Sequence, residues 1–353
     1  MKNKLFFILK GNNGATYIAN TKSWEAITYS LKFYKARTLE SKVLKNGLHC
    51  LLFLKGKLFS GKLKSPLEIN QYLQNSLKSN CEFNIDENCS VLISPTTDKV
   101  IVHHHHQYFQ KFAFGKSYAN VKNEAVIYNL FNDDIKNFQV SQFFDSYDDS
   151  ANFCSFKLSN NHLKHHKLKS NTANLIPSLV ELFKLGNGKQ CSVKNYINEL
   201  LVKIEMLGEN QMTVQIQVLE EFKNKYGKLE FPLGLVHRDF KPWNILNFEK
   251  PLIFDFEEAV IDGPPLEDVF NFYIDPIIRY KTAKEVAERT LNNEYLLKYK
   301  NYLKDLDISI GFNLFLHIYL IERMVFWIKA NDIETSTTYL NLSNYLIKES
   351  KYS

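Results

Sequence analysis

Residues 234–259 of the chain read GLVHRDFKPWNILNFEKPLIFDFEEA, the stretch with the strongest local signals in the sequence. Two short apolar runs, NIL and LIFD, flank the polar turn NFEKP, which is typical of a β-hairpin. If the runs pair with Leu246 opposite Ile253, Asn244 lies opposite Asp255 at the open end of the hairpin. Side-chain oxygens that converge at a strand end suit Mg²⁺, which binds oxygen ligands and takes phosphate oxygens for its remaining positions.

Two further carboxylates lie close to this hairpin in the sequence. Asp239 precedes Asn244 by five residues, on the loop that leads into the first run, where a carboxylate can accept a proton from an incoming hydroxyl. Glu257 follows Asp255 by two residues. It either binds a second metal ion or orients the groups that bind the first, and the sequence leaves both interpretations open.

The motifs H-R-D-F-K-P-W-N and D-F-E resemble the catalytic loop and the metal motif of the protein-kinase-like superfamily. His237, Asp239 and Asn244 match its H-x-D-x-x-x-x-N pattern. Together with the downstream segment GPPLEDVFNF, they make the chain similar to the branch of aminoglycoside phosphotransferases and choline kinases. The chain departs from that branch at Arg238, where Gly is usual, and at Phe256, which replaces Trp.

The resemblance implies a role for each matching residue. Asp239 would be the catalytic base, and Lys241 would either neutralise the γ-phosphate, as in protein kinases, or lie solvated at the surface. His237 would support the loop, and Asp268 would brace it by hydrogen bonds. The metal ligands that the resemblance implies are Asn244, Asp255 and Glu257.

The spacing after Asp255 distinguishes two branches of the superfamily. Asp268 follows it by only 13 positions, and the chain contains neither D-F-G nor A-P-E. A protein kinase inserts a long activation segment here, on which it binds an extended peptide. Its absence favours a small-molecule acceptor, although Arg238 and Lys241 make the loop locally similar to that of a protein kinase.

The region before residue 130 carries the short β-type runs SVLI, KVIV and QYFQKFAF, followed by the amphipathic helix SYANVKNEAVIYNLF. Lys111 lies on the third run, and Glu124 lies on the apolar face of the helix. A carboxylate on an apolar face is costly unless it is paired, and Lys111 is the natural cation. In the resembled family, this pair holds the nucleotide phosphates.

The remaining nucleotide contacts rest on weaker matches. The loop SPTTDK contains no glycine, and its candidate phosphate contacts are Ser94, Thr96 and Thr97. The strand FCSFKLS would supply backbone contacts to adenine near Phe156 and Leu158.

Composition limits the class of protein. The chain has 353 residues, 45% of them apolar, and a net charge of +6, which excludes a disordered chain and does not indicate nucleic-acid binding. Five cysteines without a C-x-x-C pair indicate reduced thiols and a cytoplasmic protein. The most apolar stretch, residues 311–331, carries Glu322 and Arg323 at its centre, which predicts a buried helix and no membrane span.

The order of these signals predicts an α+β, bilobal, protein-kinase-like fold, with a small antiparallel sheet lobe carrying one helix and a larger helical lobe. We expect an extension at 1–88, the sheet lobe at 89–158 and the helical lobe at 159–353. The run His103–His106 is interpreted as a strand with polar side chains, since alternate residues point to opposite faces. His162–Lys167 is interpreted as a solvated linker.

The predicted function is transfer of the γ-phosphoryl group of ATP, with Mg²⁺, to a hydroxyl of a small molecule, with ATP bound between the lobes. A sugar or glycan is the first choice of acceptor, and an amino alcohol such as choline or an aminoglycoside is the second. Two alternatives stay open: a non-catalytic nucleotide-binding pseudokinase, which the glycine-free loop favours, and phosphorylation of a protein. No nucleic-acid partner and no integral membrane segment are expected.

Overall fold

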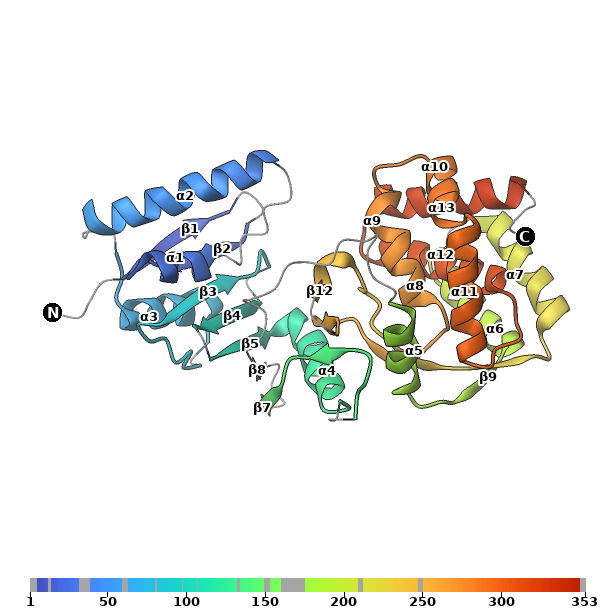
Figure 1. Ribbon diagram of the computed structural model, residues 1–353, viewed down its shortest axis with the longest axis horizontal. Helices are drawn as coiled ribbons and strands as arrows, with labels where there is room; N and C mark the ends of the chain where they lie inside the picture. Colours follow the sequence, from blue (N-terminus) through green and yellow to red (C-terminus); the bar gives the residue numbers. More distant parts are fainter. Residues whose placement is uncertain are drawn as a thin grey trace. The chain divides into compact units, whose positions relative to one another are not determined.

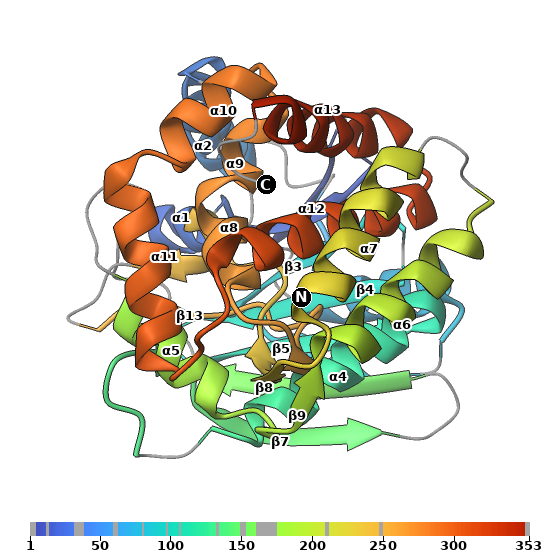
Figure 2. The ribbon, with the colours of Figure 1, turned by 90° about the vertical axis from the view of Figure 1, so that its right-hand side faces the viewer.

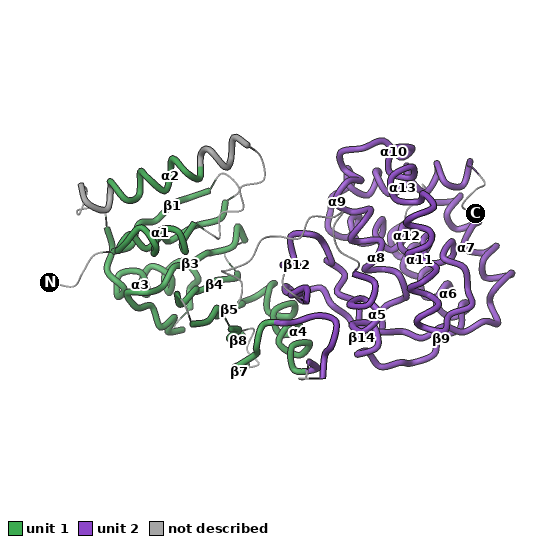
Figure 3. The backbone as a smooth tube through the Cα atoms, in the orientation of Figure 1, with its two compact units in different colours: residues 1–129, 141–164 green, residues 130–140, 165–353 purple. Residues whose placement is uncertain are grey.

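The computed structural model describes residues 5–11, 14–31, 39–58, 63–79, 81–96, 98–105, 107–131, 134–148, 153–159, 175–208, 212–246 and 250–349. The chain forms two compact units, which Figure 3 distinguishes by colour. Unit 1 comprises residues 1–129 and 141–164, and unit 2 comprises residues 130–140 and 165–353. Unit 1 contains an antiparallel sheet and unit 2 is mainly helical, which confirms the predicted α+β, bilobal fold.

Unit 1 is built on one seven-stranded sheet (Figure 1), in which every neighbouring pair of strands is antiparallel. The strands lie in the order β1 (Phe6–Lys10), β2 (Thr16–Asn20), β3 (Cys89–Ile93), β4 (Lys99–His104), β5 (Tyr108–Phe114), β8 (Phe153–Ser159) and β7 (Phe143–Asp148). The three predicted runs SVLI, KVIV and QYFQKFAF are β3, β4 and β5, which form a meander.

Residues 1–88, expected as a separate extension, are part of this sheet and of unit 1. They supply β1, β2 and the helices α1 (Trp24–Ser30), α2 (Leu39–Leu58) and α3 (Pro66–Leu77), in addition to the predicted α4 (Tyr118–Tyr128). The sheet lobe is therefore larger than predicted. The apolar run FFIL in β1 is the physical reason, because consecutive apolar residues on a strand face both sides of the sheet and both sides need cover.

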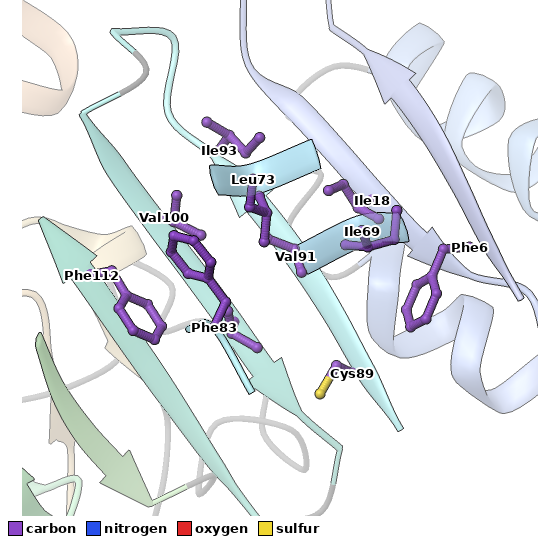
Figure 4. Packing of buried hydrophobic residues seen from close by; sticks show 11 residues of the cluster. Phe6, Ile18, Ile69, Leu73, Phe83, Cys89, Val91, Ile93, Val100 and Phe112 are labelled. Atoms are coloured by element: carbon purple, nitrogen blue, oxygen red, sulfur yellow. The ribbon is translucent and has the colours of Figure 1, made fainter. Parts of the chain in front are cut away.

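Different helices cover the two faces of the sheet. Phe6 of β1 and Leu73 of α3 belong to a buried apolar cluster that Figure 4 shows between the helix and the strands. Phe7, the next residue of β1, packs with Ile27 of α1 and Leu52 of α2 in a second cluster. The alternation of side chains along β1 thus divides its apolar residues between two cores.

Unit 2 is organised around α12 (Phe312–Lys329), which Figure 2 shows surrounded by other helices of the unit. This helix is the apolar stretch predicted to be buried, and its buried residues include Arg323. Its helical neighbours are α6 (Val193–Glu205), α7 (Thr213–Tyr226), α8 (Glu267–Tyr273), α11 (Asn293–Asp305) and α13 (Ile333–Glu349). The remaining helices of the unit are α5 (Ile176–Lys184), α9 (Asp275–Ile278) and α10 (Ala283–Thr290). Within the described residues, none of the helices is both long and apolar enough for a membrane span.

Short strands in unit 2 frame the loop that carries the motifs. β11 (Gly234–Val236) pairs with β14 (Val260–Gly263), and β9 (Gln190–Ser192) pairs with β10 (Glu230–Pro232). A Cβ at Gly234 would lie 2.4 Å from the carbonyl oxygen of Phe183, so glycine allows α5 to approach β11 closely.

The predicted hairpin exists, but its register differs by one residue. β12 (Ile245–Leu246) pairs with β13 (Leu252–Ile253), and β13 also pairs in parallel with β6 (Gln139–Val140). Leu246 lies opposite Leu252, and not opposite Ile253 as predicted. Asp255 follows the strand with φ 72°, in the left-handed region. Its side-chain direction is therefore set by this turn and not by strand alternation, which was the basis of the predicted pairing with Asn244.

Candidate active site

The loop after β11 is fixed by two buried side chains. Asp268 accepts hydrogen bonds from the backbone N–H groups of His237 at 2.6 Å and Arg238 at 2.9 Å. The His237 imidazole accepts from the backbone N–H of Asp239 at 3.3 Å through Nδ1, and its Nε2 lies 3.0 Å from the carbonyl oxygen of Phe254. A neutral imidazole with its proton on Nε2 makes both bonds. Both side chains therefore act as scaffold, as the sequence predicted.

Arg238 stands at the position where the sequence departs from the Gly of the resembled family, and its backbone is left-handed. Its backbone has φ 63°, a conformation that side chains other than Gly adopt at a cost. Its guanidinium Nε lies 3.3 Å from Oε1 of the buried Glu267. Burial raises the pKa of the Glu267 carboxyl, and the guanidinium acts in the opposite direction. Arg238 thus supplies a cation to a carboxylate that burial would otherwise destabilise.

Asp239 is held from two sides by neighbours on the same loop. Asn244 donates from Nδ2 to the Asp239 carbonyl oxygen at 2.9 Å and to its Oδ2 at 2.7 Å. The Lys241 ammonium lies 2.5 Å from Oδ1 of the same carboxylate. The Asp239 side chain nevertheless stays 32% exposed, so a substrate hydroxyl can reach it. The geometry is that of an oriented, accessible carboxylate.

Lys241 is not the solvated surface residue that one interpretation of the sequence expected. Its side chain is only 10% exposed, and its Nζ lies between Asp239 and Asp275, 2.9 Å from Oδ2 of the latter. Asp275 also lies 3.3 Å from NH2 of Arg323 and accepts a hydrogen bond from the Tyr339 hydroxyl. Burial acts to raise the pKa of Asp275, but the two cations outweigh it and lower that pKa.

Asp275 and Tyr339 belong to this network, although no motif in the sequence indicated them. Only Arg323 gave a signal, because a charged residue at the centre of an apolar helix requires a buried partner. The partner lies 48 positions earlier in the chain, which no local pattern indicates. These contacts form a chain of alternating charges that starts on the loop, in the order Asp239, Lys241, Asp275 and Arg323.

The predicted metal ligands supply a set of oxygen donors. The Nδ2 group of Asn244 is engaged with Asp239, so the Oδ1 atom is the part of the amide that remains suited to a cation. Asp255 and Glu257 each offer a carboxylate oxygen, and these two oxygens lie within 4.8 Å of each other. One amide and two carboxylates are hard oxygen donors, which fit Mg²⁺.

Glu258 is a further carboxylate of this segment, which no motif in the sequence indicated. Burial raises its pKa, and the negative charges of Glu257 and Asp239 raise it further. The positive charges of Arg238 and Arg323 act in the opposite direction on the pKa of Glu258, so carboxylates and guanidinium groups both act on this position.

In unit 1 the structure brings Lys111 and Glu124 together, as the sequence predicted. The Lys111 Nζ on β5 lies 2.7 Å from Oε2 of Glu124, whose side chain on α4 is fully buried. The Phe156 ring lies beside the ammonium, with its centroid 5.8 Å away. The contact of this pair with nucleotide phosphates stays a prediction.

The adenine contacts expected near Phe156 and Leu158 stay a prediction. Both residues lie on β8, which pairs with β5 on one side and with β7 on the other. A strand with a neighbour on each side has its backbone donors and acceptors in the two ladders. The edge of the sheet beside β8 is formed by β7.

In the glycine-free loop, the hydroxyls of Ser94 and Thr96 donate hydrogen bonds to the carboxylate of Asp98. Burial acts to raise the pKa of Asp98, but the bonds from Thr96, Ser117 and Ser94 lower it. The two hydroxyl protons are therefore directed at this carboxylate, and a role in phosphate binding stays a prediction. Thr97 lies outside the described residues, as does the segment His162–Lys167.

The three described histidines of the run, which the sequence predicted as a strand with polar side chains, are buried. His103, His104 and His105 are each less than 8% exposed, and His106 lies outside the described residues. The rings of His103 and His105 both lie against Tyr29, while His104 faces Cys89. The alternation along β4 that the sequence predicted thus divides the histidines between two buried environments.

Comparison with protein families finds that the phosphotransferase enzyme family (APH) matches residues 199–294. This segment contains the catalytic loop, the carboxylates Asp255 and Glu257, and Asp275. The match confirms the similarity of the motifs to that family and supports a phosphotransferase enzyme. A search of curated proteins finds no match.

Several solved structures are similar to the chain at low identity. Choline kinase LicA from Streptococcus pneumoniae is 12% identical, with 80% of this chain and 98% of that chain covered and a TM-score of 0.47. The apo form of a thermostable mutant of aminoglycoside phosphotransferase APH(4)-Ia is 10% identical, with coverages of 80% and 100% and a TM-score of 0.48. The GDP complex of aminoglycoside 2'-phosphotransferase-IIIa is 14% identical, with coverages of 70% and 88% and a TM-score of 0.44.

Proposed function

We propose that the chain transfers the γ-phosphoryl group of ATP to a hydroxyl of a small molecule, and that this acceptor is a sugar or a glycan. The arrangement of Asp239 is the main support. Asn244 holds one of its carboxylate oxygens and Lys241 the other, while about a third of the side chain stays open to a substrate. A general base must be held in one orientation and be reachable, and this carboxylate meets both requirements.

Each residue of the site then has one task. Asp239 orients the acceptor hydroxyl and takes its proton as the new oxygen–phosphorus bond forms and ADP leaves with the electrons of the broken bond. Lys111, paired with Glu124, binds the α- and β-phosphates. Asn244, Asp255 and Glu257 would hold Mg²⁺, which when bound neutralises charge on the phosphates. The rate gain comes from positioning and from charge stabilisation.

A short segment after Asp255 supports a small acceptor. Between Asp255 and Asp268 the chain makes a turn and then β14, which returns to pair with β11. The described residues 250–349 therefore contain no extended activation segment at this point. The preference for a sugar or glycan comes from the motifs DFKPWN and PLEDVFNF, which resemble those of phosphotransferases that act on bacterial envelope sugars.

The test follows the label from γ-labelled ATP with Mg²⁺ into small-molecule, glycan, lipid and protein fractions of a cell extract. We expect label in the sugar or glycan fraction with the wild type. Asp239→Asn should reduce transfer by about 10²–10⁴-fold, the usual contribution of general base catalysis, with nucleotide affinity retained. Asp305→Asn, which changes an exposed carboxylate on α11, is the matched control and should transfer normally.

The other outcomes separate the parts of the proposal. Label on an amino alcohol or an aminoglycoside would overturn the acceptor class and leave the reaction standing. Label on protein alone would overturn the small acceptor. ATP binding without transfer to any fraction would favour a pseudokinase. Unchanged nucleotide affinity in Asp255→Ala with Mg²⁺ present would contradict the metal role of that residue.

A further inference from the structure

We propose that unit 1 contains a second metal site, for zinc or a similar transition metal, formed by Asp86, Cys89 and His104. Each residue offers one ligand atom, and the three atoms lie within 4.8 Å of one another. Cys89 at the start of β3 and His104 at the end of β4 are cross-strand partners. The Ser94–Asp98 loop joins these strands at the opposite end of the hairpin, so the site is separate from the predicted phosphate contacts.

The distances between the ligand atoms are close to those around a tetrahedral ion. The Cys89 Sγ lies 3.1 Å from Oδ1 of Asp86 and 3.2 Å from Nδ1 of His104. The same Nδ1 lies 3.9 Å from Oδ2 of Asp86. With zinc bonds of about 2.3 Å to sulfur and about 2.0–2.1 Å to nitrogen or oxygen, tetrahedral ligand atoms are about 3.3–3.6 Å apart. Two of the observed separations lie just below this range and one lies just above it. Shifts of a few tenths of an ångström would bring all three into it.

The donor set selects the kind of ion. A thiolate and a carboxylate carry two negative charges, which balance a divalent cation, and the imidazole binds as a neutral ligand. Sulfur and imidazole favour zinc and related metals over Mg²⁺, which prefers oxygen. The nearby cation Lys157 is itself paired with Asp145 at 3.0 Å. The site therefore differs in chemistry from the oxygen donors of unit 2.

The ligands are held in place by contacts around them. The backbone N–H of Asn88 donates to Oδ1 of Asp86 at 2.6 Å, and the carbonyl of Asn88 accepts from the N–H of His105 at 2.9 Å. The His104 ring stacks on Tyr108 with centroids 4.2 Å apart. These contacts fix the turn and the imidazole before any ion arrives.

The site is open to solvent on the side of Asp86 and is otherwise buried. Cys89 and the His104 side chain are buried, whereas the Asp86 side chain is 56% exposed. An ion could enter beside Asp86, and a water molecule could take the fourth position, as in open zinc sites. Without a metal, the same geometry is a hydrogen-bonded thiol–imidazole pair, so metal uptake distinguishes the two interpretations.

The test uses the full chain after treatment with a chelator, titrated with Co²⁺ and then with Zn²⁺. Cobalt bound by a thiolate gives a sulfur-to-metal charge-transfer absorption, and zinc should displace it at one ion per chain. We expect Cys89→Ser to abolish this absorption and Asp86→Asn to weaken metal affinity by at least about tenfold, because even supporting contacts contribute 10–100-fold.

Cys154→Ser is the matched control, because Cys154 is also a buried thiol of this sheet and bonds the Tyr118 carbonyl oxygen at 3.6 Å. It should bind cobalt like the wild type. If Cys89→Ser does not fold, Asp86→Asn decides the test, since it changes an exposed side chain. Absence of cobalt uptake, an absorption that persists in Cys89→Ser, or unchanged affinity in Asp86→Asn would overturn the proposal. Both metals are probed without ATP, so the result is independent of the proposed transfer reaction.

Discussion

Asp275→Asn removes a negative charge that faces two buried cations at once. In the wild type the carboxylate lies 2.9 Å from Lys241 and 3.3 Å from Arg323, and its side chain is only 9% exposed. Removing one partner of a buried ion pair costs about 3–5 kcal/mol, because the remaining charge stays desolvated. We therefore expect unit 2 of the variant to lose about 3–5 kcal/mol in free energy of unfolding.

Tryptophan fluorescence during urea unfolding measures this loss. In a Trp24→Phe background the signal comes from Trp243 and Trp327, which both belong to unit 2. The exposed control Asp305→Asn should change stability by less than about 0.5 kcal/mol. Tyr339→Phe removes only the hydroxyl that bonds Asp275, so its loss should be about 1.5–3 kcal/mol, the contribution of a hydrogen bond to a charged group.

The same network predicts a pH dependence with a definite sign. Burial acts to raise the pKa of Asp275, but Lys241 and Arg323 lower it below the unfolded value of 3.8. The stabilisation is thus present above pH 3.8 and is lost as the pH falls through the folded pKa. Below about pH 4 the wild type should lose stability more steeply than Asp275→Asn. Equal slopes, together with a loss under about 1 kcal/mol at pH 7, would refute the reasoning.

Asp275→Asn should also affect the reaction, because Lys241 holds the carboxylate of Asp239. We expect the transfer rate to fall by roughly 10–100-fold, since a displacement of about 1 Å at a reacting group can cost 10²-fold. Nucleotide affinity should stay unchanged, which separates loss of positioning from loss of folded protein.

Three further substitutions test other parts of the structure. Glu124→Gln takes the charged partner from Lys111 and should weaken MgATP binding in calorimetry by roughly tenfold or more, since such bonds contribute about 1.5–3 kcal/mol. Arg238→Gly relieves about 1–2 kcal/mol of left-handed strain but leaves Glu267 buried without its cation. We expect the second effect to be larger, so the melting temperature should fall. Adding Glu267→Gln removes the buried carboxylate and should restore the melting temperature. Gly234→Ala should lower the melting temperature, because its Cβ would overlap the chain of α5; an unchanged value would contradict the close approach of α5 to β11.

Several features of the site could be predicted from the sequence because they depend on short spacings. The roles of His237 and Asp268 as scaffold follow from the loop motif, and the structure confirms their hydrogen bonds. The pairing of Lys111 with Glu124 followed from strand and helix periodicity together with the cost of an unpaired buried carboxylate. Contacts of this kind depend on the spacing of residues along a strand, a helix or a loop and on their charges. Both can be predicted from a short segment of the sequence.

Other features depend on which strands become neighbours. The pairing of β8 with both β5 and β7 could not be predicted from the sequence. The sequence also indicated no place for residues 1–88 in the sheet, because the pairing of β2 with β3 joins strands about 70 residues apart. The hairpin register differs by one residue from the predicted one, and Asp255 lies beyond the paired residues in a left-handed conformation, which strand alternation does not indicate.

The sequence by itself determined the chemistry of the catalytic loop: a carboxylate at Asp239, oxygen donors at Asn244 and Asp255, and a scaffold to hold them. Only the tertiary structure decided what surrounds them. Lys241, which the sequence left as a possible surface residue, is buried. Its ammonium lies between Asp239 and Asp275, because folding brings Asp275 and its partner Arg323 next to the loop. Cys89 and His104, 15 residues apart, became neighbours through the pairing of β3 with β4. These distant contacts affect stability because their groups are buried. A charge or a thiol that is removed from water costs free energy unless it has a partner inside the fold.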